Sequence, residues 1–199
     1  MENWFSEMEW VCQSQKKLAM LASVYFFACF FGGLILAPLP DKYGRKKTFI
    51  VFSVTYLIAE VTCLYCSHYW VRFVCMAVMG ALYARNTVCY NWMFELCGNQ
   101  HYSQANAAMN FSDALISVVV CGFFLLIKRD WKPILMVYSF LGISGILIQT
   151  ILIPESPKWL LINGRKKEAI EALNRISSLN CSKTRFSEAD NISVKNCSE

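Results

Sequence analysis

Charged residues are scarce in this chain of 199 residues: Asp, Glu, Lys and Arg make up 17% of it, whereas hydrophobic residues make up 56%. Soluble domains usually contain about 25% charged residues. We therefore predict a polytopic membrane protein. The net charge of +5 does not indicate a nucleic-acid partner, because the cations lie at the ends of apolar runs and in the tail. Cations in those places set membrane topology and meet lipid headgroups.

Residues that serve in catalysis or metal binding are also few. The two histidines, His68 and His101, offer no pairing with a nucleophile, and no Gly-rich phosphate loop follows a strand. Most of the ten cysteines lie inside apolar runs, where thiols pack as small hydrophobes. The spacing Cys63-x-x-Cys66 has no second pair to complete the four ligands of a zinc site. We therefore predict no enzyme activity, no metal and no cofactor.

Long apolar runs occupy most of the chain. Each has about the 20 residues with which an α-helix crosses a bilayer. They predict five transmembrane helices, at about residues 18–39, 48–66, 69–94, 105–127 and 133–153. In the first run, Ala28, Gly32 and Gly33 form a small-residue strip that another helix could approach closely. The expected fold is an all-α membrane protein with a five-helix transmembrane domain over residues 18–153.

The polar stretch Asp41-Lys42-Tyr43-Gly44-Arg45-Lys46-Lys47 joins the first two runs. Four cations and one carboxylate cannot lie in hydrocarbon, so we expect a tight polar turn at a membrane face, with Gly44 allowing the chain to reverse. Short loops rich in Lys and Arg stay in the cytoplasm. With five crossings, residues 1–17 are then an extracellular segment and the tail is cytoplasmic. Residues 1–17 have no signal-peptide pattern, and their Trp and Phe side chains favour the membrane interface.

Two features oppose this orientation. The cations between Lys128 and Lys132 would face outward. Glycosylation sequons at Asn180, Asn191 and Asn196 would place the tail in the lumen if they were used. We keep the tail in the cytoplasm because basic residues precede these sequons and an unused sequon costs nothing.

The tail begins with short helical signals. Ser156 is suited to a helix N-cap and Pro157 to the first helical position. Apolar residues recur at helical spacing from Ala169 to Ile176, which predicts an amphipathic helix over residues 165–179. Such a helix lies along the membrane face or against other cytoplasmic elements. Residues 154–180 are thus predicted as cytoplasmic amphipathic helices, and residues 181–199 as a disordered polar tail.

Four motifs resemble the major facilitator superfamily. Asp41-Lys42-Tyr43-Gly44-Arg45-Lys46 resembles its loop between helices two and three, and Glu95-Leu96-Cys97-Gly98 resembles the acidic end of its fourth helix. Pro154-Glu155-Ser156-Pro157-Lys158-Trp159-Leu160-Leu161 resembles the motif after helix six in organic-ion transporters and sugar porters. Glu9-Trp10-Val11-Cys12 is similar to an extracellular stretch of the organic cation, anion and carnitine transporters. The chain thus resembles helices two to six of an N-terminal half in that family.

Three positions depart from the family pattern. Ala37 stands where the loop motif has its first Gly, so packing against a neighbouring helix is expected to be less close. His101-Tyr102-Ser103 stands where a basic residue usually follows the acidic end of helix four. Arg72 lies about one turn further from Glu95 than the family pattern has it.

The resemblance implies a mechanism of alternating access, in which two six-helix halves rock around a site near the bilayer midplane. It also implies a conformational latch formed by Asp41, Gly44, Arg45, Lys46, Glu95, Pro154, Glu155, Ser156 and Pro157. The alternative is that the cations of the loop only fix the topology.

Three ionisable residues inside the apolar runs are candidate substrate-binding residues: Glu60, Arg85 and Asp113. Such groups are costly in a membrane and usually face a cavity or a partner. Arg85 could meet an anionic group, and Asp113 or Glu60 could meet a cation or carry a proton. Alternatively, Arg85 and Asp113 pair with each other, or Asp113 lies at the cytoplasmic edge. Aromatic residues could line a cavity for cations or pack against lipid and core: Tyr25, Tyr56, Tyr83, Trp92 and Phe111.

These observations predict a multi-pass transporter, or a piece of one, for small organic cations or anions in the plasma membrane. One alternative is a transport-inactive membrane subunit or assembly protein derived from a half transporter. A second is a sugar-porter-type carrier. The expected partners are the lipid bilayer, the organic ion and a second half-transporter chain or another copy of this chain.

Overall fold

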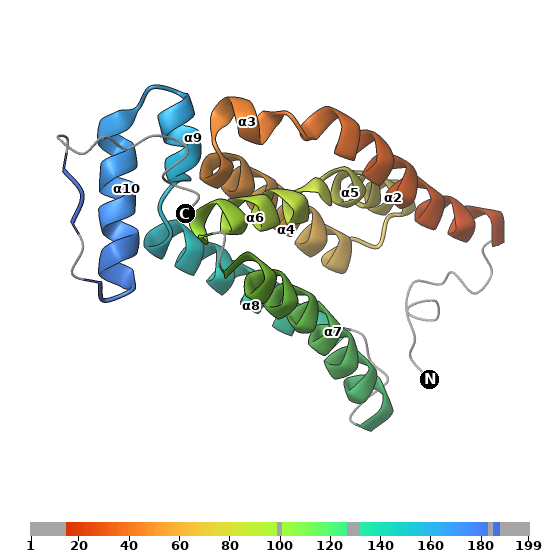
Figure 1. Cartoon of the computed structure of the whole chain (residues 1–199). Coiled ribbons are helices and arrows are strands. Elements are labelled where there is room, and N and C mark those ends of the chain that lie inside the picture. The colour runs from red at the N-terminus through yellow and green to blue at the C-terminus, as the bar shows by residue number, and fades with distance from the viewer. Residues whose placement is uncertain (1–14, 99–100, 127–131, 183–184, 188–199) are drawn as a thin grey trace.

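The computed structural model describes residues 15–98, 101–126, 132–182 and 185–187, and all regular secondary structure in those ranges is helical (Figure 1). The helices are α2 (Gln15–Leu36), α3 (Leu39–Tyr43), α4 (Arg45–Tyr65), α5 (Tyr69–Ala81), α6 (Ala84–Leu96), α7 (Tyr102–Leu126), α8 (Lys132–Leu152), α9 (Pro157–Ile162) and α10 (Lys166–Leu179). Within the described residues, five helical spans are long and apolar enough to cross a membrane: Lys16–Tyr43, Arg45–Tyr65, Tyr69–Leu96, Tyr102–Leu126 and Lys132–Leu152. The predicted all-α fold with five spans is confirmed.

The polar turn between the first two spans is shorter than the sequence predicted. Asp41 lies inside α3, and Arg45 begins α4, so Gly44 alone links these two helices. Gly44 has a φ of 103°, which glycine adopts without steric cost. The prediction of a turn over residues 41–47 was wrong because a helix can continue past the hydrocarbon layer. Its backbone stays hydrogen-bonded while long cationic side chains reach water.

The third apolar run forms two helices, α5 and α6, and not the continuous helix predicted over residues 69–94. At the break, the Tyr83 N–H donates to the Gly80 carbonyl at 3.1 Å, and the Arg85 N–H donates to the Leu82 carbonyl at 3.0 Å. Hydrogen bonds between residues three apart are those of a 3₁₀-helix, which winds the chain more tightly than an α-helix. No proline marks the place, and the apolar pattern runs through it, so the sequence could not show this break.

The contact between α2 and α5 depends on two glycines. A Cβ atom added to Gly32 would lie 2.4 Å from the Ala81 Cα, and one added to Gly80 would lie 2.2 Å from the Tyr25 carbonyl oxygen. Hydrogen is therefore the largest substituent that fits at either position. Gly33 has nothing within 4 Å of its Cβ position. The small-residue strip thus brings two helices together at Gly32 and not at Gly33.

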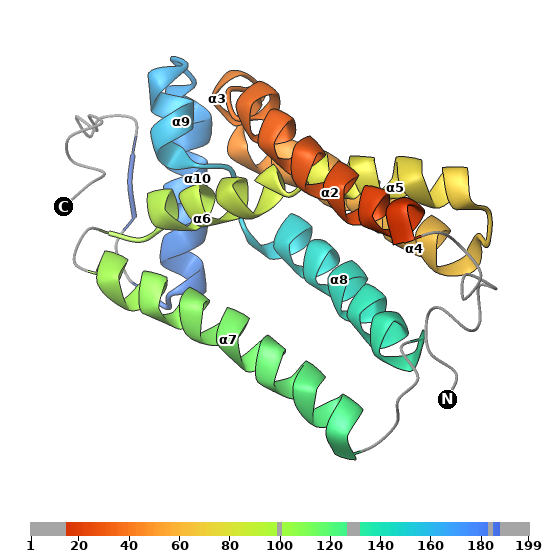
Figure 2. The same cartoon turned by 90° about the vertical axis from the view of Figure 1, so that its right-hand side faces the viewer.

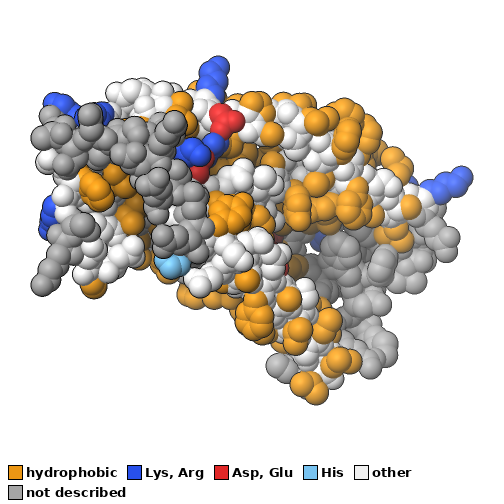
Figure 3. Space-filling model, in the orientation of Figure 1, with side chains coloured by type: hydrophobic (Ala, Val, Ile, Leu, Met, Phe, Trp, Pro, Cys, Tyr) orange, Lys and Arg blue, Asp and Glu red, His pale blue; other side chains and the backbone are white. Residues whose placement is uncertain are grey.

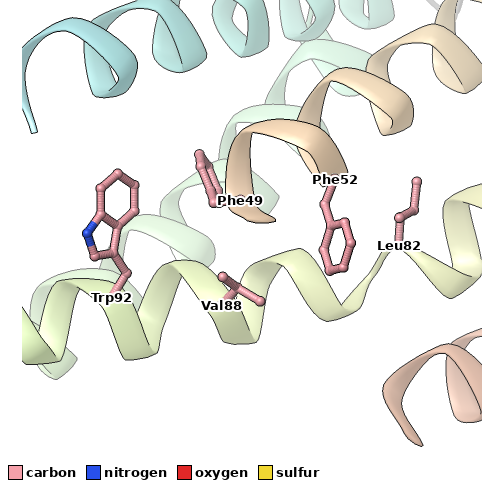
Figure 4. Packing of buried hydrophobic residues seen from close by; sticks show 5 residues of the cluster. All are labelled: Phe49, Phe52, Leu82, Val88 and Trp92. Atoms are coloured by element: carbon pink, nitrogen blue, oxygen red, sulfur yellow. The ribbon is translucent and has the colours of Figure 1, made fainter. Parts of the chain in front are cut away.

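The largest buried apolar cluster lies between α4 and α6. Figure 4 shows Phe49 and Phe52 on α4 near Val88 and Trp92 on α6, with Leu82 at the α5–α6 break. Trp92 is 2% exposed, and its indole N–H donates to the Pro154 carbonyl at 3.2 Å. A buried indole usually finds such an acceptor. Trp92 is therefore a core residue, not part of the aromatic cavity that the sequence suggested.

Helix α7 stands apart from most of the bundle (Figure 2). Its apolar membrane-spanning stretch has no buried residue, and its exposed side chains include Phe111, Leu115, Val118 and Leu125. Hydrophobic side chains are frequent on the visible face of α7, on which no Lys or Arg side chain is seen (Figure 3). A surface of this kind faces lipid or another apolar helix.

Helices α9 and α10 pack together at the end of the bundle where α3 lies (Figures 1 and 2). Trp159 and Leu160 on α9 contact Ala169 and Ala172 on α10. The amphipathic helix predicted over residues 165–179 occurs as Lys166–Leu179. The part of its apolar face formed by Ala169 and Ala172 is therefore covered by α9.

Several predictions fall on residues outside the described ranges. They concern most of the extracellular segment 1–17 with its Glu9-Trp10-Val11-Cys12 motif, and the cations at Lys128 and Arg129. They also concern the sequons at Asn191 and Asn196 and most of the tail 181–199. Gln15, Lys16 and Lys17 belong to α2, so this helix includes three residues that precede the predicted start at 18.

The two neighbouring glycines of α2 provide a test of the helix contact. We expect Gly32→Ala to destabilise the protein by about 1–3 kcal/mol, because the new methyl group meets the α5 backbone. Gly33→Ala should be neutral or stabilise by up to about 1 kcal/mol, because alanine is the better helix former and the space is open. Thermal unfolding of both variants in the same detergent measures the difference. Equal midpoints would contradict the close contact.

Candidate functional site

Arg45 connects three helices at the end of the bundle. Its Nη2 donates to Glu95 Oε1 at 3.1 Å and its Nε donates to Glu95 Oε2 at 3.3 Å, while Nη1 pairs with Asp41. The side chains of Arg45 and Glu95 are only 15% and 17% exposed. A forked pair that is shielded from water holds a defined geometry, whereas a fully exposed pair contributes little. Arg45 therefore fixes the start of α4 against the end of α6.

Glu155 caps the same end of α4. Its Oε1 accepts hydrogen bonds from the Lys46 N–H at 2.9 Å and from the Ser156 N–H at 3.1 Å. The first N–H groups of a helix have no partner within the helix, and a carboxylate there is also favoured by the helix dipole. The Lys46 ammonium group donates to the Ile153 carbonyl at 2.7 Å. The segment after α8 is thus bound to the first turn of α4.

The segment Pro154–Pro157 is itself ordered by local bonds. Ser156 accepts the Trp159 N–H at 3.2 Å as the N-cap of α9, and Pro157 occupies the start of that helix. The Trp159 indole N–H donates to the Asp41 carbonyl at 2.7 Å. This bond ties α9 to α3. Trp159 was quoted in the motif but was not predicted as a site residue, because an indole in a motif does not reveal its acceptor.

The nine residues of the predicted latch all lie in this one region, which we call the charged cluster: Asp41, Gly44, Arg45, Lys46, Glu95, Pro154, Glu155, Ser156 and Pro157. They come from the α3–α4 link, the end of α6 and the segment before α9. The structure thus brings together residues that are up to 116 positions apart in the numbering, from Asp41 to Pro157.

The three ionisable residues of the membrane-spanning region have separate partners. The Arg85 guanidinium lies over the Tyr56 ring, 3.8 Å from its centroid. Asp113 accepts a hydrogen bond from the Tyr90 hydroxyl. Glu60 accepts one from the Ser139 hydroxyl at 3.4 Å. A direct Arg85–Asp113 ion pair, the alternative raised by the sequence, does not occur in the described structure.

Arg85 and Asp113 nevertheless line the same pocket, which has a volume of about 300 Å³ and lies between α4, α6, α7 and α8. Glu60 does not line it. Two residues that the sequence did not suggest do line it, Ser53 on α4 and Gln149 on α8. We call this space the inner pocket. Of the suggested aromatic residues, Tyr56 contacts Arg85, while Phe111 is 69% exposed on α7.

Nothing in the sequence pointed to Ser53 or Gln149. A serine inside an apolar helix usually bonds to its own backbone and carries no signal of function. Ser53 Oγ and Gln149 Oε1 are both buried, and neither of these two atoms has a hydrogen-bond partner in the described part of the chain. In the same ranges, no three His, Cys, Asp or Glu side chains gather closely enough to hold a metal ion.

Comparison with known proteins gives one family. The model of the family described as "Sugar (and other) transporter" matches residues 2–195. The Organic cation transporter protein of Drosophila melanogaster is 29% identical over 175 residues, which are 86% of this chain and 32% of that protein. Organic cation/carnitine transporter 5 of Arabidopsis thaliana is 28% identical over 181 residues, 88% of this chain and 35% of that protein.

A third relative, Solute carrier family 22 member 15 of Xenopus tropicalis, is 25% identical over 166 residues, 79% of this chain and 29% of that protein. The chain therefore spans about a third of the length of these relatives. The resemblance drawn from the four motifs is confirmed, and with it the prediction of an integral, multi-pass membrane protein.

Gly44 provides a test of the charged cluster. A Cβ atom at this position would lie 2.6 Å from Glu155 Oε2. Gly44→Ala should therefore displace the carboxylate and lose its bonds to Lys46 and Ser156, worth about 1.5–3 kcal/mol in addition to backbone strain. Thermal unfolding should show a smaller effect of Gly44→Ala in a Glu155→Ala background.

Gly164→Ala is the control for backbone strain. Gly164 also has a positive φ, 74°, but nothing lies within 4 Å of its Cβ position. Its substitution should cost about 1–2 kcal/mol, and the cost should be the same with Glu155 or Ala at position 155. Additivity of Gly44→Ala and Glu155→Ala would contradict a contact between these residues.

Proposed function

The chain belongs to the sugar (and other) transporter family, and we therefore propose that it takes part in moving small organic ions across the plasma membrane by alternating access. Relatives named organic cation transporter and organic cation/carnitine transporter support the organic-ion class. In this proposal the chain supplies helices that correspond to one half of a carrier. A second half, either another chain or another copy of this one, completes the substrate path.

The charged cluster is the observation that carries this proposal. A carrier that alternates between two states needs contacts that hold one state and can be released. The Arg45–Glu95 pair and the Glu155 cap join the ends of α4, α6 and α9 through charge-assisted hydrogen bonds, which separate without disrupting the apolar core. We propose that these contacts form a latch, and that this end of the bundle faces the cytoplasm because it carries many of the chain's cations.

For substrate contact we propose Arg85 and Asp113. They lie on different helices, α6 and α7, and line one pocket within the membrane-spanning region. Their opposite charges would allow the pocket to accept groups of either sign. Glu60 lies outside the pocket with Ser139 as its partner. We propose for it the role of carrying a proton.

A second candidate function is that of a transport-inactive membrane subunit. The exposed apolar face of α7 favours it, because such a face can serve in assembly with another membrane chain. A sugar-porter-type carrier is the third candidate, since the family description includes sugars.

Uptake by vesicles distinguishes these functions. The purified chain is reconstituted into liposomes, and uptake of tetraethylammonium, benzoate and glucose is measured under a pH or voltage gradient. We expect saturable uptake of at least one ion, reduced at least about tenfold in Arg85→Ala or Asp113→Asn, which remove a charged contact to substrate. Uptake of glucose alone would favour the sugar carrier. No uptake by a chain that purifies in a stable complex would favour the subunit.

The latch is tested with Glu95→Gln, which keeps the shape of the side chain but removes its charge. Weakening the bond to Arg45 by about 1–2 kcal/mol should raise the open population about 5- to 30-fold. The readout is the rate at which a water-soluble maleimide labels Cys97, which follows α6 directly. The control is Glu168→Gln, because Glu168 pairs with Arg165 at the surface of α10. Equal Cys97 labelling in both variants would contradict the latch.

A further inference from the structure

The inner pocket contains a serine whose bonding differs from that of its neighbours. On α4, the hydroxyl groups of Thr55 and Thr62 donate to the carbonyls of Val51 and Ile58, at 2.8 and 2.7 Å. Ser53 lies on the same helix and is only 1% exposed, but its Oγ has no partner among the described residues. Buried hydroxyls that could bond to their own helix normally do so. The Ser53 hydroxyl is therefore available to a group in the pocket.

Gln149 on α8 presents a second polar atom to the same pocket. Its Oε1 is buried and accepts no hydrogen bond within the described ranges. An amide oxygen can only accept. Whatever satisfies it must therefore carry an N–H or O–H group.

Arg85 adds a positive charge to the pocket. Its guanidinium carbon lies over the Tyr56 ring, 3.8 Å from the centroid. Contact with a ring face does not use up the five N–H donors of a guanidinium. Among the described residues, Arg85 forms no direct ion pair with Glu60 or Asp113. An anionic group is the natural partner for a guanidinium in a medium of low polarity.

We propose that the inner pocket is a binding subsite for a small carboxylate that also carries a hydroxyl or amino group. The carboxylate meets the Arg85 guanidinium and the Ser53 hydroxyl, and the ligand's O–H or N–H donates to Gln149 Oε1. An ammonium group can in addition reach Asp113, which also lines the pocket. The volume of about 300 Å³ is at the small end of the range of ligand sites.

This subsite rests on the proposed function and names a substrate class for it. Its residues also predict which organic ions the pocket binds and which it rejects. An organic cation without N–H or O–H groups supplies neither an anion for the Arg85 guanidinium nor a donor for Gln149 Oε1. Sites built to hydrogen-bond a ligand reject analogues that lack the bonding group, because their own buried polar atoms are then unpaired. The pocket should thus prefer L-lactate to propionate and should not bind tetraethylammonium.

Cys89 provides the readout, because it lines the pocket. The full chain in lipid nanodiscs is treated with N-ethylmaleimide, and modification of each cysteine is quantified by mass spectrometry. L-lactate should protect Cys89 at a concentration about tenfold lower than propionate, the value expected for one hydrogen bond. Tetraethylammonium should not protect it. Modification of Cys181, exposed after α10, should be unchanged by each probe.

Two variants test the polar atoms directly. Gln149→Leu should remove the advantage of L-lactate over propionate, and Ser53→Ala should weaken protection by both carboxylates. Neither variant should lower the thermal stability, because each removes a buried polar atom that lacks a partner. A structural role for these side chains predicts the opposite, namely lower stability with unchanged protection, and that result would overturn the proposal.

A second pair of variants tests whether the open volume of the pocket is needed for binding. Gly145 lines the pocket and has nothing within 4 Å of its Cβ position, so Gly145→Val should fill the pocket and abolish protection. Gly122 on α7 is equally open but does not line the pocket, and Gly122→Val should keep protection.

The outcomes separate this subsite from the transport function. If L-lactate protects Cys89 but vesicles take up no ion, the transport proposal fails and the subsite is supported. If vesicles take up ions while no carboxylate protects Cys89 in the unmodified chain, the subsite is wrong and the transport proposal is unaffected.

Discussion

The first turn of α4 is the point on which the arrangement of the other helices depends. Gly44 is the single link to α3, the Arg45 side chain holds Glu95 at the end of α6, and the Lys46 N–H holds Glu155 before α9. One turn further along, Phe49 begins the apolar contact with Trp92. Polar bonds therefore hold the first turn of α4 against the end of α6, and apolar packing holds the next turn of α4 against the same helix.

The use of polar bonds at one place and close packing at another follows from the lipid environment. Lipid chains are as apolar as the side chains that they contact, so helices in a bilayer gain little by burying hydrophobic surface against each other. Close packing and polar bonds must hold them together. Helices α2 and α5 have the close packing at Gly32 and Gly80, and α4 has the polar bonds. Helix α7 contacts α6 through the Tyr90–Asp113 bond and the stacked rings of Phe94 and Tyr102, and most of its other side chains are exposed.

The same reasoning explains what the sequence could and could not predict. The five spans were predictable because bilayer thickness sets their length, and the gathering of Arg45, Glu95 and Glu155 followed from motifs in a recognisable order. The break at Leu82 was not predictable, since apolar residues continue through it. Nor were Ser53 and Gln149, because their missing partners are a property of how α4 and α8 meet. A polar residue in an apolar run looks the same whether or not its own helix satisfies it.

The charged cluster and the inner pocket share two helices, and this has a mechanical consequence. Arg45 and Ser53 both lie on α4, eight residues and about 12 Å apart along its axis. Glu95 and Arg85 both lie on α6. A ligand held between Ser53 and Arg85 would therefore oppose the same separation of α4 from α6 that the Arg45–Glu95 pair opposes. Because a ligand shifts a conformational equilibrium only by binding one state better, any change in this spacing would make ligand affinity depend on whether the Arg45–Glu95 pair is formed.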